Sequence, residues 1–437
     1  MRRYDAVIIG GGLAGLIAAI ELAEAGKTAL VLEKSGKLGG RAMTVNKNGA
    51  LFNLGGHALY AGGEADRLFR RYGLKLTGGS PAAKGTAIWN GQLAPLPGDP
   101  LSLLSSKLLG WLGKGRLVRL LLKIAKADDV GLRAVSLREW AEREIGDPMV
   151  RHIFYALCRT ATYTQDPDYQ SAGPALKQVR RSLKAGGVKY VDGGWQSIVD
   201  QLRDKAAALG VRIHSGASVQ EIRHERGATI GVRCADGAEI AAAAVISTAS
   251  PAATFAMTPG AEGTALRRWK EEARPMYAAS LDLALRRLPT ADRHLAIGLD
   301  RPIFFAHHSR VARLSENGTI VVHVMKYNGL GGQDAKADER QLEQTMSLLH
   351  PGWEKEVAAR QYLPNIAVVH DYPHIGRTFP DAGPEVPEIR GLCVAGDWAS
   401  HGELLVDAAA ASALRAARLV ATGDWRLREA VSVGSGA

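Results

Sequence analysis

The chain has 437 residues, too many for one small hydrophobic core, and this length predicts two or three domains or two lobes built from interleaved segments. Hydrophobic residues make up 46% and charged residues 23%, which is ordinary for a soluble globular protein. No apolar run reaches the roughly 18 residues that a transmembrane helix needs. The net charge of +11 permits an acidic partner, but no nucleic-acid-binding motif accompanies it, so we expect no nucleic-acid partner.

The N-terminus and the cysteines bear on location and metal binding. A strand pattern begins by Tyr4, which leaves no room for a signal peptide, and we expect a cytoplasmic protein. Cys158, Cys234 and Cys393 lie far apart and form no CxxC pair, so neither a zinc site nor a redox dithiol is indicated. There is also no HExxH, no GxSxG and no acidic cluster with metal-ligand spacing, so we expect no metal and no protein nucleophile.

The first forty residues predict a βαβ unit that binds a dinucleotide. The apolar run YDAVII at 4–9 predicts a buried parallel strand. LIAAIELAEAG at 16–26 predicts a helix that ends at Gly26, and TALVLE at 28–33 predicts a second strand. Between the first strand and the helix stands the G-x-G-x-x-G motif that typically holds a pyrophosphate.

Each residue of this motif has a physical task. Gly10 permits the tight turn out of the strand, Gly12 lets a pyrophosphate approach the backbone, and Gly15 lets the helix pack closely on the sheet. The helix N-terminus, which includes Leu13 and Ala14, offers N–H groups to the phosphates. Glu33, 18 residues after Gly15, is placed to accept hydrogen bonds from the adenosine ribose, which disfavours NADP.

A second glycine motif follows that acid. Lys34 comes directly after Glu33, and the segment 37–42 reads KLGGRA. Here the sequence resembles the flavoprotein superfamily of amine oxidases, phytoene desaturases and protoporphyrinogen oxidases. The resemblance implies that Gly39 and Gly40 pass close to FAD and that Arg41 places a guanidinium beside the pyrophosphate or the flavin.

The resemblance continues at four further segments. NLGGH at 53–57 resembles a turn beneath the flavin, which implies contacts from Gly55, Gly56 and His57. YVDGGW at 190–195 resembles the re-entry into the FAD domain, and ASVQEI at 217–222 resembles the strand whose valine, here Val219, meets adenine. AVIST at 244–248 resembles the next strand, which ends at Thr248.

The C-terminal match is the second strong signal. GLCVAGDW at 391–398 resembles the motif in which a strand delivers Gly396 and Asp397 to the ribityl chain or the pyrophosphate. LLVDAA at 404–409 then opens an alanine-rich helix, and the resemblance places Leu405 and the Val406 N–H at flavin N1 and O2.

The resemblance therefore implies an α/β fold: a Rossmann-like FAD-binding domain with a parallel sheet and an inserted α+β substrate domain with an antiparallel sheet plus helices. We expect the FAD-binding domain at 1–75, 186–255 and 366–428, the substrate domain at 76–185 and 256–365, and a tail at 429–437. SLDLAL at 280–285 and TIVVHVM at 319–325 predict strands of the antiparallel sheet.

The middle of the chain is basic and rich in leucine. Between Asp99 and Asp128 there are six lysines and arginines and no acidic residue. Leucines at helical spacing in 100–126 predict either an amphipathic helix in peripheral contact with a membrane or guarding a lipophilic entrance, or a packed helix with a solvated basic face. The segment 136–163 predicts further helix, with Ser136 as its N-cap.

FAD carries the chemistry in such a protein, because flavin N5 accepts a hydride and the protein positions the substrate. Candidates for proton transfer are His57, His374 and His401. Trp398 and Tyr372 either form a wall near the flavin or simply pack.

One departure from the family matters. Amine oxidases of this family commonly carry a lysine that reaches flavin N5 through water, but the nearest match, 275–281 (PMYAASL), has none, and Lys326 lies on a different strand. The aromatic pair that holds an amine is not evident either. Cys393 lies inside the C-terminal strand rather than where the family attaches flavin, so we expect non-covalent FAD.

Three functions follow from these observations. The leading one is an FAD-dependent dehydrogenase, desaturase or oxidase that takes a hydride from a small lipophilic molecule. The second is an amine or amino-acid oxidase that releases hydrogen peroxide. The third is a non-catalytic binding protein with the same fold, against which the intact phosphate-binding motifs argue. The sequence does not fix the oligomeric state.

Overall fold

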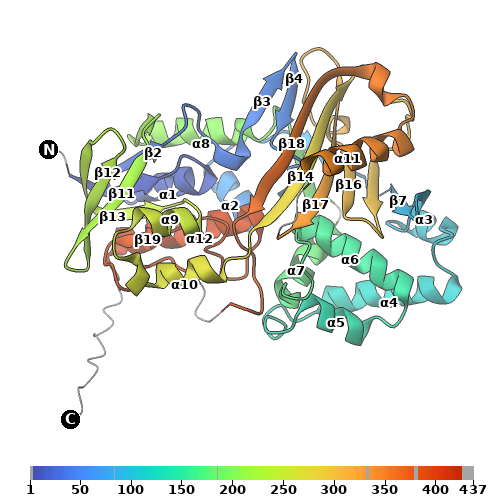
Figure 1. Cartoon of the computed structure of the whole chain (residues 1–437), viewed down its shortest axis with the longest axis horizontal. Coiled ribbons are helices and arrows are strands. Elements are labelled where there is room, and N and C mark those ends of the chain that lie inside the picture. The colour runs from blue at the N-terminus through green and yellow to red at the C-terminus, as the bar shows by residue number, and fades with distance from the viewer. Residues whose placement is uncertain (1–2, 83, 185, 331–333, 378–381, 426–437) are drawn as a thin grey trace, which may run out of the picture.

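The computed structural model describes residues 3–82, 84–184, 186–330, 334–377 and 382–425, so the expected tail at 429–437 lies outside the described residues. Two lobes lie side by side (Figure 1). One is built on a largely parallel sheet and the other on a mixed, mainly antiparallel sheet with a group of helices beneath it. This is the expected combination of a Rossmann-like domain with an α+β domain.

The first lobe holds the predicted βαβ unit. Strands β10, β2, β1, β13 and β19 run parallel, and β13, β12 and β11 continue as an antiparallel meander. The chain forms parallel strands here because β1 and β2 are apolar runs that are buried along nearly their whole length. The strands are β1 (Tyr4–Ile9), β2 (Ala29–Glu33), β10 (Arg212–Ser215), β11 (Val219–Glu225), β12 (Ala228–Cys234), β13 (Glu239–Ser247) and β19 (Leu392–Val394).

Helices cover both faces of this sheet. One face packs against α1 (Leu13–Glu24), α8 (Gln196–Ala208) and α12 (Leu405–Thr422), with α2 (Glu64–Arg71) beside α12. The other face packs against α10 (Ala265–Glu272), whose Leu266 and Trp269 share a core with Val7 and Val245; α9 (Pro251–Met257) packs on α10. The expected boundary at 256 is therefore too early, because the apolar side of α10 is buried against the parallel sheet.

The second lobe is built on seven strands in the order β18, β14, β17, β16, β15, β7, β8. All neighbours are antiparallel except β15 and β7. The two strands predicted from 280–285 and 319–325 pair directly, and α11 (Ala335–Leu349) covers one face of the sheet. The strands are β7 (Gly85–Trp89), β8 (Gln92–Leu96), β14 (Met276–Leu285), β15 (Leu295–Gly298), β16 (Ile303–His307), β17 (Ile320–Gly329) and β18 (Val357–Val369).

Two small sheets lie beside these layers. The hairpin of β3 (Thr44–Lys47) and β4 (Ala50–Asn53) packs Ala50 and Phe52 against Ala284 and Val321 of the large antiparallel sheet. The three-stranded sheet consists of β5 (Leu59–Tyr60), β9 (Val188–Val191) and β6 (Gly78–Gly79).

The helical part of the second lobe corrects two expectations. The segment 100–126 is two helices, α3 (Pro100–Ser105) and α4 (Trp111–Lys126), and not one; α4 begins at Gly110 as its N-cap. The segment 136–163 is likewise divided into α5 (Leu137–Glu144) and α6 (Pro148–Thr162), because Asp147 caps α6 and the ring of Pro148 fits only a first turn. The expected N-cap Ser136 does accept the Glu139 N–H.

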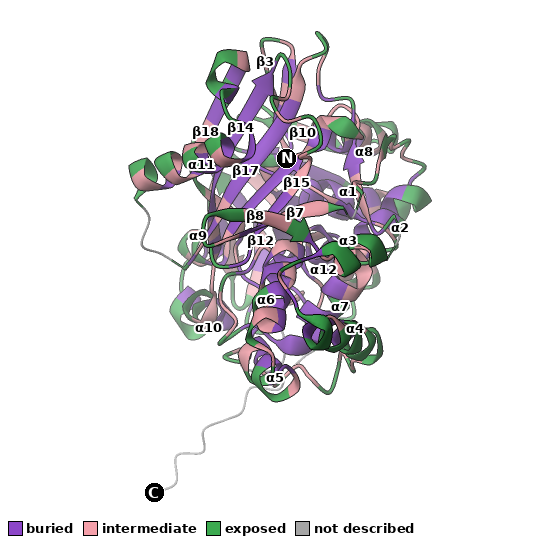
Figure 2. Cartoon of the chain, turned by 90° about the vertical axis from the view of Figure 1, so that its right-hand side faces the viewer, coloured by how far each residue is buried: buried purple, intermediate pink, exposed green. Residues whose placement is uncertain are grey.

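The last helix of this part, α7 (Ala172–Ser182), packs against α6 and is largely buried, whereas α3 and α4 show much exposed surface (Figure 2). Within the described residues, no helix is both long enough and apolar enough to cross a membrane. Cys158, Cys234 and Cys393 are buried free thiols.

Candidate functional site

The glycine-rich turn after β1 has the geometry that its sequence predicts. Gly10 has φ of +104°, and a Cβ there would lie 2.4 Å from the Thr248 hydroxyl oxygen. A Cβ on Gly15 would lie 1.9 Å from the carbonyl oxygen of Gly10, so only glycine permits this contact between helix and strand. A Cβ on Gly12, in contrast, would meet nothing closer than the Gly39 carbonyl oxygen at 3.7 Å. Gly12 therefore leaves room on its outer side.

The N-terminus of α1 has no protein cap. Gly12 is the N-cap, no side chain accepts a hydrogen bond from the first turn, and that turn holds no acidic residue. Elsewhere in the chain α6 and α11 are capped by Asp147 and Asp334. The first N–H groups of α1, beginning at Leu13 and Ala14, are therefore available to an anionic ligand.

Glu33, which is expected to bind the adenosine ribose, is the last residue of β2. Its carboxylate accepts hydrogen bonds from the Gly11 N–H at 2.7 Å and the Ser35 N–H at 2.8 Å, which fixes it at the end of β2. The Glu33 carbonyl accepts the Ala217 N–H, so Val219, half-buried at the start of β11, follows two residues from this contact. Lys34 is exposed.

The second glycine motif lies directly beside the first. The Gly39 N–H donates to the Gly11 carbonyl at 2.9 Å, and Gly12 and Gly39 form a parallel bridge. Gly39 and Gly40 have φ of +122° and +55°, which favours glycine at both positions. The two motifs together make a strip of backbone without side chains, as a pyrophosphate requires.

Arg41 and Asp397, separated by 356 positions in the chain, meet at this strip. The guanidinium donates two hydrogen bonds to the carboxylate, at 2.9 and 2.7 Å, and one to the Val368 carbonyl at 3.1 Å. The same carboxylate accepts the His370 N–H at 2.8 Å. Burial alone would raise the pKa of Asp397, but Arg41 and His370 hold it well below its usual range. The pairing of Arg41 with Asp397 and the contribution of His370 carry no local sequence signal.

A second uncapped helix faces this region. The N-terminus of α12 has Leu404 as N-cap with no side-chain hydrogen bond, and Leu405 adopts the left-handed φ of +56°. Val406 is buried in the first turn. Asp407, also in that turn, accepts hydrogen bonds from the Arg181 guanidinium and the Ala65 N–H. Its carboxylate therefore does not cap the N–H groups of its own helix. The Gly396 N–H is bonded to the Ser412 hydroxyl within α12, which fixes the C-terminal strand to this helix.

The turn at Gly55–His57 is buried between the lobes. A Cβ on Gly55 would lie 3.1 Å from Ile366, and the Gly56 N–H donates to the Met325 sulfur at 3.2 Å. The Gly56 carbonyl accepts the Tyr163 hydroxyl at 3.0 Å, a contact that the sequence did not indicate.

His57 joins two of the predicted cofactor segments. One ring nitrogen is 3.0 Å from the Gly55 carbonyl and the other is 3.0 Å from the Arg41 carbonyl, and the ring packs on Trp195. Burial lowers the pKa of His57. Since both nitrogens already have backbone partners, the geometry supports a positioning role, and the expected proton transfer by His57 stays a prediction.

A buried polar cluster lies beneath this turn, and the sequence reading missed it. Asp282 accepts hydrogen bonds from Ser280 at 2.6 Å and Gln361 at 3.0 Å, and lies 2.7 Å from a ring nitrogen of His323. The His308 ring meets the His323 ring edge-on at 4.3 Å. Ser280, Asp282 and His323 are completely buried. The signal was the polar residue at every second position of an otherwise apolar strand, which shows that β14 has a polar contact on one face.

His374, another candidate for proton transfer, lies in a second polar cluster. His374 is 3.4 Å from the Asp371 carboxylate and its ring packs edge-on against Tyr372, whose hydroxyl donates to Asp166. Burial lowers the pKa of His374 to about 4. His374 therefore belongs to a buried polar cluster, and its expected proton transfer stays a prediction.

Trp398 and His401 follow the C-terminal motif. The Trp398 indole is 1% exposed, donates to the Ala249 carbonyl at 2.9 Å and lies against Trp269. The Trp398 ring is packed, and its expected place in a wall near the flavin stays a prediction. One ring nitrogen of His401 is 3.2 Å from the Gly383 carbonyl.

These residues fit FAD. The strip at Gly10–Gly15 and Gly39–Gly40 offers backbone and free helix N–H groups to a pyrophosphate, and Glu33 offers a carboxylate to a ribose. The second uncapped helix, α12, begins at Leu405 and Val406, and the partial positive charge of its N-terminus would favour negative charge on a bound flavin.

Comparison with known proteins agrees with this fit. A family model described as flavin containing amine oxidoreductase matches residues 13–281, more than half of the chain. The chain is 29% identical over 249 residues to a putative flavin-containing monoamine oxidase, AofH, of Mycobacterium tuberculosis, covering 52% of this chain and 53% of that protein. It is 26% identical over 278 residues to 4,4'-diapolycopene oxygenase of Methylomonas sp, covering 55% and 54%. The chain thus spans about half the length of these curated relatives.

Solved structures share the fold over nearly the whole chain. An oxidoreductase from Methanosarcina mazei superposes with a TM-score of 0.74 at 21% identity, covering 94% of this chain and 99% of that one. Putrescine oxidase bound to putrescine gives 0.71 at 16% identity, covering 96% and 99%. At these identities the likeness concerns the fold. With the family match, it establishes that the chain belongs to the flavin-containing amine oxidoreductase family, whose cofactor is FAD.

Proposed function

We propose that this protein oxidises a small lipophilic molecule by hydride transfer to non-covalently bound FAD, and that its substrate is not a simple amine. The observation that carries the proposal is the face of β14 that contacts the Gly55–Gly56 turn. Side chains alternate along a strand, and the residues on this face are Ala278, Ser280, Asp282 and Ala284. This is the strand where family amine oxidases commonly carry a lysine.

Lys326 does not replace that lysine. It pairs with Ala279 in the sheet register, and its ammonium forms an ion pair with Asp338 of α11, which is 2% exposed. α11 covers the opposite face of β14, where Leu281 and Leu283 pack. The Lys326 ammonium is thereby committed to the side of the sheet that faces away from the Gly55–Gly56 turn.

The groups around the turn support a lipophilic substrate. Met325, Ile366 and Tyr163 contact it. Leu405 lies at the start of the uncapped helix, next to Leu404, in a small core with Tyr372. Apolar side chains of this kind orient a substrate by shape and exclude water, with few polar contacts.

When bound, FAD supplies the hydride acceptor. The chain's own residues fix the surroundings. The His57 ring lies between the Gly55 and Arg41 carbonyls and, when neutral, donates a hydrogen bond to one of them. The Arg41–Asp397 pair links the N-terminal motif to the C-terminal one. Asp282 holds His323 in one orientation beneath the turn. Cys393 is fully buried in β19, so its thiol is not available for a covalent flavin bond.

Anaerobic bleaching of the visible flavin band tests the proposal. The purified holoenzyme is mixed with paired substrates, each pair an isoprenoid or alicyclic hydrocarbon and the primary amine of the same skeleton. We expect bleaching by members of the hydrocarbon set and none by the matching amines. An oxidised flavin throughout the hydrocarbon set would contradict the proposal.

Amine oxidation is the second candidate, because the matching family model and the mycobacterial relative carry that description. The same panel distinguishes it. Bleaching by amines alone, followed by peroxide release when air is admitted, would establish this candidate and remove the first.

A further inference from the structure

We propose that helices α3 and α4 form a docking surface for an anionic phospholipid bilayer. The proposal concerns the helical part of the second lobe and does not depend on which substrate the flavin site takes. It rests on two observations: an apolar surface that has no partner within the described chain, and basic side chains beside it that have no acidic partner among the described residues.

Helix α4 carries two apolar stripes where a packed helix needs one. Gly113, Leu117, Leu120 and Ile124 recur at helical spacing and are buried against the lobe. A second stripe of Trp111, Val118 and Leu122 follows the same spacing on the opposite side and is exposed.

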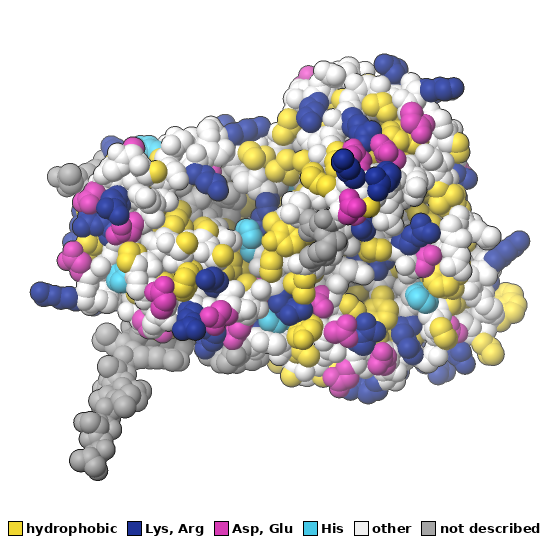
Figure 3. Space-filling model, viewed as in Figure 1, with side chains coloured by type: hydrophobic (Ala, Val, Ile, Leu, Met, Phe, Trp, Pro, Cys, Tyr) yellow, Lys and Arg dark blue, Asp and Glu magenta, His cyan; other side chains and the backbone are white. Residues whose placement is uncertain are grey.

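The exposed stripe continues onto neighbouring positions. Leu112, beside Trp111, is 79% exposed, and Trp111 itself is 77% exposed. On α3, Leu101 and Leu104 lie three residues apart on one face and are also exposed. Hydrophobic side chains lie at the lower right-hand edge of Figure 3, where Figure 1 places α4. Large exposed apolar side chains on two successive helices indicate an interaction site.

Basic side chains border the stripe. Lys114 lies 4.7 Å from the centre of the Trp111 ring. Arg119 and Lys126 lie one turn before and after Leu122, and together with Lys107 they have no acidic partner within the described residues. No acidic residue occurs between Asp99 and Asp128.

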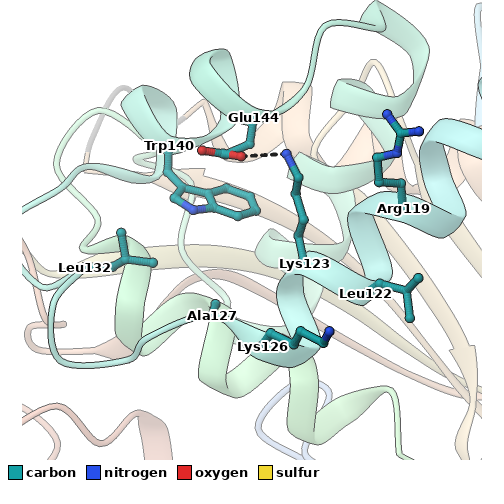
Figure 4. A pocket seen from close by; sticks show the side chains of 8 residues that line it. All are labelled: Arg119, Leu122, Lys123, Lys126, Ala127, Leu132, Trp140 and Glu144. Carbon is teal, nitrogen blue, oxygen red and sulfur yellow. Dashed lines mark hydrogen bonds and ion pairs between the residues drawn. The ribbon is translucent and has the colours of Figure 1, made fainter.

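A hollow of about 390 Å³ opens beside Leu122, between α4 and α5 (Figure 4). Arg119 and Lys126 line it from α4, and Lys123 spans it to Glu144 at 2.7 Å. The depression therefore presents two uncommitted cations next to the apolar stripe. Cations beside exposed tryptophan and leucine match a surface where acyl chains meet anionic headgroups. A protein partner would need acidic groups of matching spacing, whereas a lipid surface needs only negative charge and hydrocarbon.

Flotation of the full-length holoprotein with lipid vesicles tests the proposal. Vesicles of phosphatidylcholine alone are compared with vesicles of phosphatidylcholine and phosphatidylglycerol in a seven-to-three ratio. We expect binding to the anionic vesicles, weakened by added salt, and little binding to the neutral ones.

Variants at exposed positions separate the two contributions. Leu112→Ser and Leu122→Ser each remove an apolar side chain, and we expect binding at least about tenfold weaker. Lys126→Gln removes one cation, and we expect a loss of about fivefold. Leu209→Ser in the FAD-binding lobe and Arg340→Gln on α11 are matched exposed controls that should bind as the unaltered protein does.

A label reports the contact directly. The three native cysteines are buried, so a Leu112→Cys variant takes an environment-sensitive fluorophore at that position. Its emission should shift to the blue on anionic vesicles, and the same label at Leu209→Cys should not respond. Absence of flotation, or flotation of the Leu112→Ser and Leu122→Ser variants equal to that of the unaltered protein, would overturn the proposal. So would concentration-dependent dimerisation that Leu112→Ser abolishes, since the stripe would then be an interface between copies.

Discussion

Helices α1 and α4 use their surfaces in opposite ways. Helix α1 buries nine of its twelve residues, and the groups that it offers to a ligand are the N–H groups at its uncapped N-terminus. Helix α4 buries four of its sixteen residues, and the groups that it offers to a partner are exposed side chains along its length. On our proposals, α1 binds through its end and is fixed by close packing, whereas α4 binds through its flank and keeps one apolar side out of the core.

One methyl group on each helix gives the largest contrast. In Gly15→Ala the new Cβ would lie 1.9 Å from the Gly10 carbonyl, a backbone atom that does not move without shifting β1. We expect loss of FAD and a fall in the melting temperature beyond that of any substitution below. In Gly113→Ala the Cβ would meet the Leu109 side chain at 3.0 Å, which moves aside, and alanine favours the helix by about 1 kcal/mol. Flavin content and thermal unfolding of both variants measure the contrast; equal behaviour would contradict it.

The ion pair at the glycine strip should contribute more to the free energy of unfolding than the ion pair on α4 does. Asp397→Ala leaves Arg41, whose side chain is 39% exposed, without its carboxylate, and we expect the free energy of unfolding in urea to fall by about 1–3 kcal/mol, as for a lost hydrogen bond to a charged group. Glu144→Gln breaks the Lys123 pair on the exposed side of α4, and we expect about 0–1 kcal/mol. Because the pKa of Asp397 is depressed in the fold, its contribution is present above about pH 4 and is lost as the pH falls further. A small effect for Asp397→Ala would show that the pair does not join the two motifs.

Buried histidines should make the core sensitive to acid while the α4 surface is not. Burial lowers the pKa of His350 and of His374 to about 4. The unfolded chain takes up these protons near pH 6.5 and the folded chain does not, so stability falls as the pH drops from about 6.5 towards 4. The expected loss is about 2 kcal/mol per histidine at pH 5. His350→Gln should flatten the urea-unfolding profile between pH 7 and 5 by that amount, with vesicle binding unchanged; an unaltered slope would contradict this.

The smallest expected change is in the rate of flavin reduction, and it tests whether Lys326 takes part in catalysis. In Lys326→Met the rate of anaerobic flavin reduction should change less than about threefold, because the ammonium faces α11, whereas loss of a proton-transfer group costs about 100-fold or more. Stability should fall by about 1–3 kcal/mol, since Asp338 loses its cation. Stopped-flow reduction and urea unfolding separate the two effects.

The sequence predicted the cofactor half well because its signals are local. Buried parallel strands appear as apolar runs, and β1 was predicted with its observed bounds, Tyr4–Ile9. The spacing of Gly10 and Gly15 predicted a close contact between helix and strand that only glycine permits. The uncapped start of α12 followed from the family resemblance at 404–409.

What the sequence missed depends on pairing at long range. Asp282 and His323 face each other only because β14 and β17 align them directly across the sheet. Arg41 and Asp397 were both expected near FAD, but nothing local in the sequence showed that they bind each other. The break between α3 and α4 was missed because leucine spacing continues through both helices.

Gly12→Ala tests the central claim, that FAD lies along the glycine strip at the end of α1. The new Cβ would have no protein atom closer than 3.7 Å, and Gly12 has an ordinary extended conformation with φ of −79° and ψ of −175°, so the apoprotein should unfold as the unaltered chain does. In a titration of apoprotein with FAD, followed by quenching of flavin fluorescence, we predict at least about tenfold weaker binding, because the methyl group enters the space of the pyrophosphate. Unchanged FAD affinity in a stably folded Gly12→Ala apoprotein would contradict the account.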